Sequence, residues 1–404
     1  MKNNVFVPAD ILIPEGVSPE NWSVVACDQF SSERDYWERV RGRVAGQPST
    51  LGMIIPEAYL EEINEADEIA KISAAMDGCL SGGVLREVKD SFVYVERALP
   101  DGKVRRGIVG AVDLEEYEFS RSGAAILASE GTVLERLPAR IRVRSAASLE
   151  LPHIIAFIDD SGDTVIGPLS EKADSLPLLY DFTLMEGGGH IRGRQVAGGD
   201  AEGVMAAMRA LHDKNDILMV IGDGNHSLAA AKVYWDELKL SLSAKERLAH
   251  PARYALLEVN NVYDEAICFE AIHRVVFGAE ALECAREFKA AMARGDDYEL
   301  QLVSREEDGT LGVSADCIGG MISAVQAFLD EYVARTGCRI DYIHGEDALK
   351  RLAENDGALG IILPAMDKSE LFATVAASGV FPRKSFSVGH AWEKRYYLEC
   401  RAIT

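Results

Sequence analysis

The chain has 404 residues, 48% of them hydrophobic, so it can bury a sizeable core and is expected to form two or three domains. Its 65 acidic and 42 basic residues give a net charge of −23, which repels nucleic-acid phosphates and anionic membranes. No segment has the apolar length needed to span a bilayer, and the first ten residues lack a signal-peptide hydrophobic region. We therefore expect a cytoplasmic protein that binds neither nucleic acid nor membrane.

The pattern of cysteines also favours a cytoplasmic protein. The seven cysteines are scattered, odd in number and contain no C-x-x-C pair, as expected for reduced thiols in a cytoplasm. The sequence has no H-E-x-x-H motif and no cysteine–histidine cluster, so a structural zinc site is not expected.

The first part of the chain alternates short strands with turns, and Asp28 is its most notable polar residue. We expect strands at 5–7 and 22–26, a helix over 56–76, and a strand pair at 85–98 and 104–112. Asp28 follows the second strand in C-D-Q-F, where a strand end would present it to a cleft. It could equally be the N-cap of a helix that begins near Ser32.

Residues 119–144 concentrate positive charge in an otherwise acidic chain. They contain Arg121, Arg136, Arg140, Arg142 and Arg144, with Glu130, Gly131 and Thr132 among them. The planar guanidinium suits phosphate and carboxylate oxygens, and a carboxylate held among arginines can act as a general base or a magnesium ligand. The alternative is a solvated helix whose arginines and glutamates pair locally.

The middle of the chain supplies weaker signals. Residues 151–158 and 164–166 are predicted to form a hairpin, and 178–185 a strand. That strand runs into three glycines and His190, which suit either close approach of a ligand to the backbone or a hairpin turn. Residues 200–214 are predicted to form an amphipathic helix.

The stretch over residues 217–239 predicts a strand, a tight glycine turn and a helix. The apolar run 217–221 ends at Gly222-Asp223-Gly224, and an alanine-rich helical pattern follows. Asp223, Asn225, His226 and Ser227 lie at the junction, where the helix N-terminus suits a phosphate or carboxylate. The alternative is an ordinary turn with Asn225 or Ser227 as the N-cap.

The remainder of the chain alternates helix and strand, which is typical of an α/β fold. Strands are expected at 254–259, 272–277, 298–303, 340–343 and 360–363, and helices at 281–293, 321–336, 346–354 and 368–376. His250 and His273 lie at strand boundaries and are expected to be structural. Arg383 and Lys384 form a second basic spot, either on a loop over the site or simply on an exposed turn.

Several motifs resemble those of an uncharacterised bacterial family in the ParB/sulfiredoxin superfamily. D-G-N-H-S at 223–227 is similar to the family's D-G-H-H-R motif. Matching pieces are C-D-Q-F at 27, S-E-G-T-V-L-E-R at 129, L-Y-D-F-T-L-M-E-G-G-G-H at 179, H-P-A-R-Y-A-L-L-E at 250, I-H-R-V-V-F at 272 and P-R-K-S-F-S at 382. They span the chain almost from end to end.

The resemblance implies a mixed α/β fold with a ParB/sulfiredoxin-like core. We expect an N-terminal segment over 1–83, a core carrying the site over 84–278, and an additional C-terminal α/β portion over 279–404. Superfamily members include sulfiredoxin, CTP-binding ParB proteins and a free-serine kinase, which place a nucleotide or phosphate at the corresponding loop and helix. Sulfiredoxin activity is not expected, because no cysteine is near His226 in the sequence.

These features favour a small-molecule phosphotransferase that moves phosphate between a nucleotide or other donor and a hydroxyl metabolite such as free serine. Glu130, Asp223 and His226 are its expected catalytic residues, with Glu130 also the candidate ligand of Mg²⁺. The expected binding residues are Asp28, Arg121, Thr132, Arg136, Arg140, His190, Gly224, Asn225, Ser227, Arg383 and Lys384. The alternative is a regulatory protein that binds a nucleotide or phosphometabolite without turnover.

Overall fold

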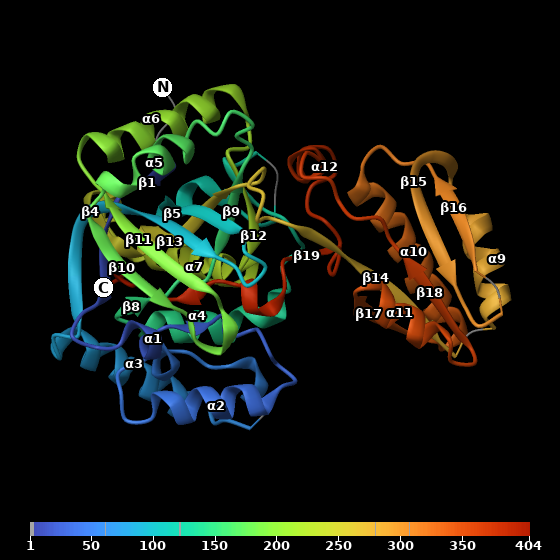
Figure 1. Ribbon diagram of the computed structural model, residues 1–404, viewed down its shortest axis with the longest axis horizontal. Helices are drawn as coiled ribbons and strands as arrows, with labels where there is room; N and C mark the ends of the chain where they lie inside the picture. The colour runs from blue at the N-terminus through green and yellow to red at the C-terminus, as the bar shows by residue number, and fades with distance from the viewer. Residues whose placement is uncertain (1–3, 61, 121–122, 279, 307) are drawn as a thin grey trace. The chain divides into compact units, whose positions relative to one another are not determined.

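The structure is a computed structural model that describes residues 4–60, 62–120, 123–278, 280–306 and 308–404, and the chain forms two compact units (Figure 1). The first unit comprises Met1–Ala128, Thr132–Ile267 and His390–Thr404, and the second comprises Ser129–Gly131 and Cys268–Gly389. The protein is thus a mixed α/β protein with several sheets. The three-part division predicted above stays a prediction.

The first unit is built on a sheet of eleven described strands. Its main path runs β10 (Leu178–Thr183), β11 (His190–Val196), β4 (Leu85–Ala98), β5 (Val104–Asp113), β13 (Tyr254–Asn261), β9 (Ile155–Ile158), β12 (Met219–Asp223), β7 (Ile126–Ala128) and β6 (Tyr117–Glu118). β1 (Phe6–Val7) pairs with β5, and β2 (Ala9–Pro14) pairs with β4. Most pairs are antiparallel, but β9–β13, β7–β12 and β6–β7 are parallel.

The C-terminal segment returns to this unit in two short ladders. β20 (Tyr396–Tyr397) pairs with β3 (Val24–Val25), and β21 (Arg401–Ala402) pairs with β8 (Leu149–Glu150). The segment therefore pairs with strands that precede it by 371 positions (Tyr396 with Val25) and by 251 positions (Arg401 with Glu150), and its side chains are placed inside the first unit.

Helices cover both faces of the large sheet. They are α1 (Pro19–Trp22), α2 (Arg34–Val44), α3 (Glu65–Ser81), α4 (Leu137–Ala146), α5 (Gly167–Glu171), α6 (Gly199–Lys214), α7 (Asn225–Leu238) and α8 (Ala244–Ala249). Alternation along β4 divides the core, because Phe92 and Tyr94 pack with α6 and α7 while Val93 and Val95 pack with α2 and α3. In Figure 1, α5 and α6 lie along one side of the unit and α2 and α3 along the opposite side.

The second unit has a sheet in the order β16 (Gly309–Val313), β15 (Arg294–Val303), β18 (Ala358–Ile362), β14 (Phe269–Phe277) and β17 (Arg339–His344), with β19 (Phe386–Val388) also on β14. Its helices are α9 (Ala281–Ala291), α10 (Ile318–Thr336), α11 (Glu346–Ala353) and α12 (Glu370–Ser378). Each corresponds closely to a helix expected from the sequence, and the predicted alternation of helix and strand is confirmed.

Three local predictions were wrong. The hairpin over 151–166 does not form: only β9 is a strand, and Asp160 instead accepts a hydrogen bond from the Val165 amide, at 2.9 Å, in the turn that leads to α5. The helix expected over 56–76 begins only at Glu65, where Asn64 accepts hydrogen bonds from two amides as the N-cap, and it continues to Ser81. Asp28 does not cap α2, whose N-cap residue is Glu33.

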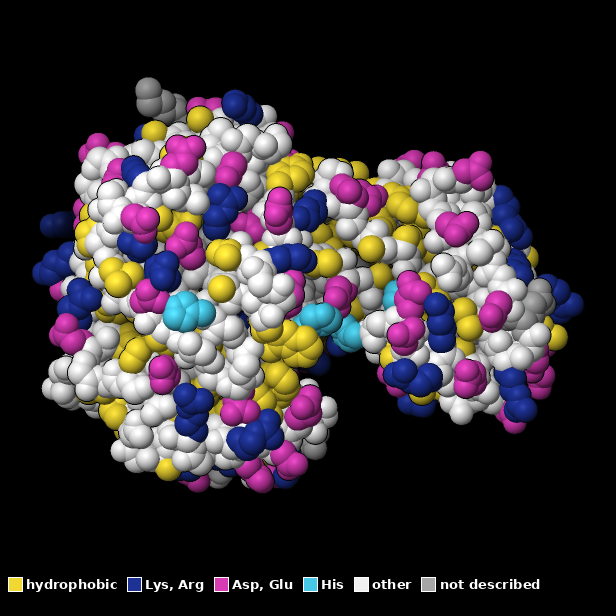
Figure 2. Space-filling model, in the orientation of Figure 1, with side chains coloured by type: hydrophobic (Ala, Val, Ile, Leu, Met, Phe, Trp, Pro, Cys, Tyr) yellow, Lys and Arg dark blue, Asp and Glu magenta, His cyan; other side chains and the backbone are white. Residues whose placement is uncertain are grey.

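Surface charge is mixed. Figure 2 shows lysine and arginine side chains interspersed with acidic ones over the visible face, in place of an extended basic surface. Among the described residues, no helix has the length and apolar character required to cross a membrane.

Candidate functional site

The turn between β12 and α7 is shaped by one glycine. Gly224 has a φ of 78°, in the left-handed region, and a Cβ atom there would lie 2.8 Å from Cγ1 of Ile154. Only glycine fits such a position without strain. Gly224 is also the N-cap of α7, so the expectation that Asn225 or Ser227 caps the helix is wrong. The predicted strand, glycine turn and helix are confirmed.

Asp223 ends β12 and is held on both carboxylate oxygens. Oδ1 accepts a hydrogen bond from the Gly224 amide at 2.9 Å, and Oδ2 lies 3.3 Å from Nζ of Lys394. The Asp223 and Lys394 side chains are only 14% and 11% exposed. A nearly dry ion pair therefore lies at the N-terminus of α7, where an anion is favoured by the helix dipole.

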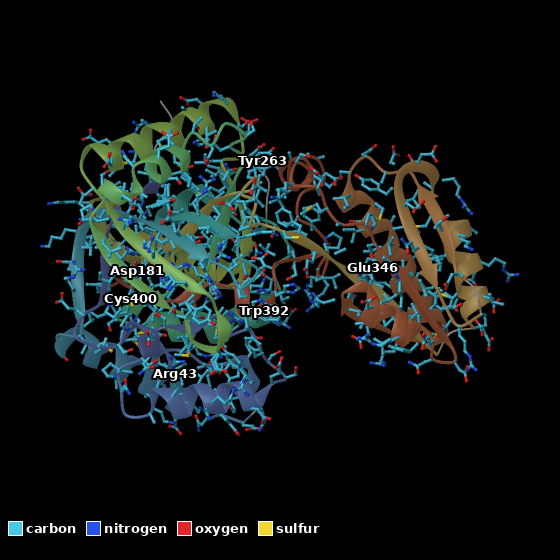
Figure 3. The ribbon with its side chains drawn as sticks, viewed as in Figure 1. Arg43, Asp181, Tyr263, Glu346, Trp392 and Cys400 are labelled. Carbon is cyan, nitrogen blue, oxygen red and sulfur yellow. The ribbon has the colours of Figure 1, made fainter. Side chains whose placement is uncertain are left out.

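Two buried arginines fix the backbone that carries Lys394. Arg97 donates to the carbonyls of Trp392, at 2.6 Å, and of Lys394, at 2.5 Å. Arg105 donates to the carbonyl of Glu393 at 2.9 Å. Trp392 is labelled in Figure 3 on this segment. Because the carbonyl groups would otherwise be buried without partners, these bonds hold Lys394 in one position.

Asp28 is the second carboxylate near Lys394. Burial alone would raise the pKa of Asp28, but the charges of His153 and Lys394 and a hydrogen bond from Gln29, at 3.0 Å, hold the pKa below its usual value. Asp28 is therefore ionised at neutral pH. The sequence-predicted Asp28 is thus within electrostatic range of the Lys394 ammonium group, which pairs directly with Asp223.

A chain of polar side chains extends from this cluster. Nδ1 of the buried His153 lies 3.0 Å from the Tyr397 hydroxyl, and its Nε2 lies 3.5 Å from Oγ of Ser227. The Tyr397 hydroxyl also accepts a hydrogen bond from the Cys27 amide at 3.3 Å. Burial raises the pKa of the Cys27 thiol to about 12, with Asp28 as a second cause, so this cysteine stays protonated. It lines the same cavity as Ser227, which the sequence did not indicate.

These polar groups form one wall of a cavity of about 380 Å³ in the first unit. The rest of its lining is mainly apolar, from α3, α4, α7, β13 and the segment before α3. Its apolar members are Met53, Ile54, Ile55, Leu60, Ile63, Met76, Ala139, Val143, Ala147, Leu149, Leu151, Pro152, Ile154, Ala230, Ala231, Ala255 and Leu256. The volume is at the lower end of the range for small-molecule sites.

The arginines expected to neutralise phosphate are engaged with carboxylates. Arg140 lies 2.7 Å from Glu57, and both line the cavity. Arg142 pairs with Glu65 at 2.7 Å, and Arg144 pairs with Glu150 at 2.9 Å. Neither reading of this helix holds: Arg140 and Arg142 pair with glutamates of distant segments, and not with glutamates of the same helix or with an open anion site.

Other predicted binding residues lie apart from these pairs. Arg136 is exposed, and Arg121 lies outside the described residues. His190 begins β11, where it contacts Asp181 of the edge strand β10, labelled in Figure 3, and Thr183 at 3.2 Å. His190 does not line the cavity. The glycines before it form the connection between β10 and β11, so the hairpin reading of this segment is confirmed.

His226 has a defined hydrogen bond. Its Nε2 accepts from the Val133 amide at 3.1 Å, which places the proton of the neutral ring on Nδ1. Nearby in sequence, the hydroxyl of Thr132 is buried without a hydrogen-bond partner among the described residues. Asn225, the first residue of α7, immediately precedes His226 in the chain.

Glu130 belongs to the second unit. Its backbone forms an isolated parallel β-bridge with Phe381. Burial lowers the pKa of Arg274 to about 10, and the negative charge of Glu130 partly opposes this shift. Arg383 and Lys384 are exposed residues of the same unit. The Ser385 hydroxyl donates a hydrogen bond to the Pro382 carbonyl at 2.6 Å, across the turn that contains them. A shared site of these residues with Asp223 stays a prediction.

The residues offer limited support for a bound metal. Among the described residues there is no group of three or more His, Cys, Asp or Glu side chains that could hold a metal ion. Magnesium carried by substrate phosphates needs only one or two protein carboxylates, and the ionised, half-buried Asp28 fits that contact.

Sequence reasoning missed three central residues, namely His153, Lys394 and Tyr397. None lies near the D-G-N-H-S motif in sequence; His153 and Lys394 are outside helices and strands, and Tyr397 belongs to the two-residue strand β20. The one available signal was W-E-K-R-Y-Y over residues 392–397, an unusual run of aromatic and charged residues near the C-terminus.

The fold can be compared with solved structures. Free serine kinase in complex with AMP gives a TM-score of 0.37 at 11% identity, over 71% of this chain and 90% of that one. SbnI from Staphylococcus aureus, truncated at its C-terminus, gives 0.36 at 9% identity, over 70% and 82%. A conserved hypothetical protein from Pyrococcus furiosus gives 0.35 at 13% identity, over 71% and 90%. Similarities at this low identity and TM-score give no information on the chemistry of this chain.

Sequence comparison is more decisive on the family. No curated protein has a significantly similar sequence. The family model described as "Protein of unknown function (DUF1015)", however, matches residues 13–332, which is more than half of the chain. The resemblance to a family of unknown function is thereby confirmed, and the chain belongs to the DUF1015 family.

Proposed function

We propose that the protein is a phosphotransferase that moves phosphate from a nucleotide or another phosphate donor to the hydroxyl group of a small molecule. The observation that carries the proposal is the Lys394 ammonium group, held nearly dry beside Asp223 at the left-handed turn that starts α7. Phosphoryl transfer needs mainly positioned positive charge and an oriented hydroxyl, and a low-dielectric position makes such a charge more effective.

The acceptor hydroxyl is proposed to face the polar wall of the cavity. His153 lies there with Nε2 directed to Ser227, so the ring can take the hydroxyl proton as the acceptor oxygen attacks phosphorus. The phosphorus–oxygen bond to the donor then breaks, and the donor leaves with one phosphate fewer. Asp223 orients Lys394, and the Gly224–Ser227 turn receives the phosphate. Magnesium, if carried by the donor, supplies further positive charge.

A regulatory protein that binds a phosphate compound without turnover is the second candidate. It is favoured by the state of the catalytic residues expected from the sequence, because Oδ1 of Asp223 and Nε2 of His226 already accept hydrogen bonds, and Oδ2 of Asp223 faces the Lys394 ammonium group. Such groups are poorly available for proton transfer, yet they fix the shape of a binding site equally well.

Turnover separates the two candidates. The full chain is incubated with ATP, ADP or pyrophosphate, with Mg²⁺, and with free serine or a simple alcohol, and phosphate esters are measured by phosphorus NMR. Formation of an ester in wild type and its loss in His153→Gln supports the phosphotransferase. Saturable binding of a phosphate compound without ester formation supports the regulator. Absence of both overturns the proposed function.

A further inference from the structure

The cavity beside the polar wall is larger and drier than a purely polar acceptor requires. Free serine consists almost entirely of polar groups, whereas the lining away from the wall is formed mainly by aliphatic side chains such as Ile55, Met76 and Val143, together with charged side chains that form Arg–Glu pairs. Polar groups moved into such surroundings without partners lose free energy. The cavity is therefore poorly suited to serine alone.

We propose that the cavity is the subsite for an aliphatic group of the acceptor, so that the substrate is an alcohol or hydroxy acid with an apolar chain. This inference rests on the proposed function only for the reacting end of the ligand. The cavity volume of about 380 Å³ holds on the order of ten water-sized groups, at roughly 30 Å³ each. An aliphatic chain of about eight carbons with its hydroxyl head fills that space.

The charges at the cavity support an apolar occupant. Arg140 and Arg144, the two arginines in its lining, are each paired with a glutamate of the lining, Glu57 and Glu150. An anion placed among these pairs would have to compete with carboxylates already 2.7 and 2.9 Å away. The reactive end of the ligand is therefore expected at the polar wall, next to His153 and Ser227.

A purine base is the other apolar group that could enter. Its ring nitrogens and amino group require hydrogen-bond partners when they leave water. The uncharged polar groups of the lining are confined to the wall of Cys27, His153, Ser227 and Tyr397, whose side chains already bond to one another in part. The aliphatic surface elsewhere meets the needs of a methylene chain and not those of a base edge.

Binding of two homologous series to the full chain tests the proposal. Calorimetry compares n-alkyl phosphates with n-alkyl alcohols, from two to ten carbons. We expect the affinity of both series to rise about fourfold for each added methylene, and to level off near eight carbons. Val143→Phe should narrow the cavity, so that the affinity levels off at a shorter chain length than in wild type while ethyl phosphate still binds. Ile141→Phe, on the same helix but outside the lining, is the matched control.

The outcomes distinguish this inference from the proposed function. Binding of ethyl phosphate with no gain from longer chains overturns the aliphatic subsite and leaves the proposed function standing. Length-dependent binding of alcohols without affinity for any phosphate supports the subsite and overturns the proposed function. Displacement of octanol by adenosine, lost in Val143→Phe, assigns the cavity to a base and overturns the inference.

Discussion

Replacement of Lys394 by methionine should test the proposed site most directly. Methionine retains a long apolar side chain but removes the ammonium group that lies 3.3 Å from Asp223. If Lys394 neutralises a bound phosphate, the variant loses a charged hydrogen bond to the ligand, which is typically worth about 1.5–3 kcal/mol. The affinity for pyrophosphate or an alkyl phosphate should then fall roughly ten- to hundredfold.

The same change has a predictable effect on stability. At 3.3 Å and an effective dielectric constant of about 20, the attraction between the two charges is roughly 5 kcal/mol before the cost of desolvation. Removal of one member of a buried pair typically costs about 3–5 kcal/mol, because the remaining charge is left without a partner. We therefore expect a clear fall in the free energy of unfolding for Lys394→Met.

A second substitution separates binding from stability. In Lys394→Met/Asp223→Asn the buried aspartate charge is also removed, so stability should recover in part while phosphate binding stays weak. Lys232→Met is a matched control, because Lys232 is also buried and its ion pair with Asp236, at 3.2 Å, is separate from the pair of Lys394 and Asp223. Urea unfolding and calorimetry measure the two effects. Unchanged phosphate affinity in folded Lys394→Met would refute the assignment of Lys394 to the anion.

Three further predictions concern the neighbouring structure. Gly224→Ala should lower the free energy of unfolding by about 1–2 kcal/mol or more in urea titrations, because of its left-handed φ and its contact with Ile154; stability equal to wild type would contradict the strained turn. If Glu130 belongs to the phosphate site, as the sequence predicts, Glu130→Gln should abolish turnover with a melting temperature close to wild type, whereas retained turnover with a lower melting temperature would assign the carboxylate to the support of Arg274. Burial raises the pKa of Glu150, but the charges of Arg401 and Arg144 outweigh this effect and hold the pKa below 4.5. The carboxylate therefore stabilises the fold fully above that pH, and the stabilisation is lost as the pH falls through the lower pKa of the folded state. Glu150→Gln should lose less stability than wild type between about pH 5 and pH 3 in urea titrations, and equal losses would contradict the pKa assignment.

Regular structure was predictable where its signals are local. The strand pair β4 and β5 and the helix α6 follow from hydrophobic periodicity within single segments, and their observed bounds differ little from those expected. The hairpin over 151–166 was wrong because Asp160 and Asn261 bond to the backbone of the turn, and Asn261 comes from a strand about 100 positions away. A pattern within one segment carries no information on such partners.

The candidate site was predictable only at its local part. The glycine turn and the helix N-terminus are encoded in seven consecutive residues, and their geometry was expected correctly. Lys394 and His153 were missed because their positions depend on long-range contacts, in particular on Arg97 and the return of the C-terminal segment to β3. The charges of Arg140 and Arg142 were visible in the sequence, but their pairing with glutamates of distant segments was not.

The charges of the site itself imply a role for magnesium that can be measured without catalysis. When His153 is neutral, as its role as general base requires, Asp28 and Asp223 contribute two negative charges and Lys394 one positive charge, so the cluster is net negative before any ligand binds. A phosphate dianion adds to that charge inside a protein whose net charge is −23. Because repulsion in a poorly solvated position is weakly screened, the anion should bind well only together with a cation.

We therefore expect Mg²⁺ to raise the affinity for pyrophosphate at least tenfold in calorimetry, with Asp28 as the carboxylate that contacts the ion. In Asp28→Asn the repulsion on the bare anion falls and the contact to the ion is lost. Pyrophosphate alone should then bind more tightly than it does to wild type, and the gain from magnesium should shrink. An equal gain from magnesium in both proteins would mean that the ion acts only by neutralising the ligand in solution, and that Asp28 has no contact with it.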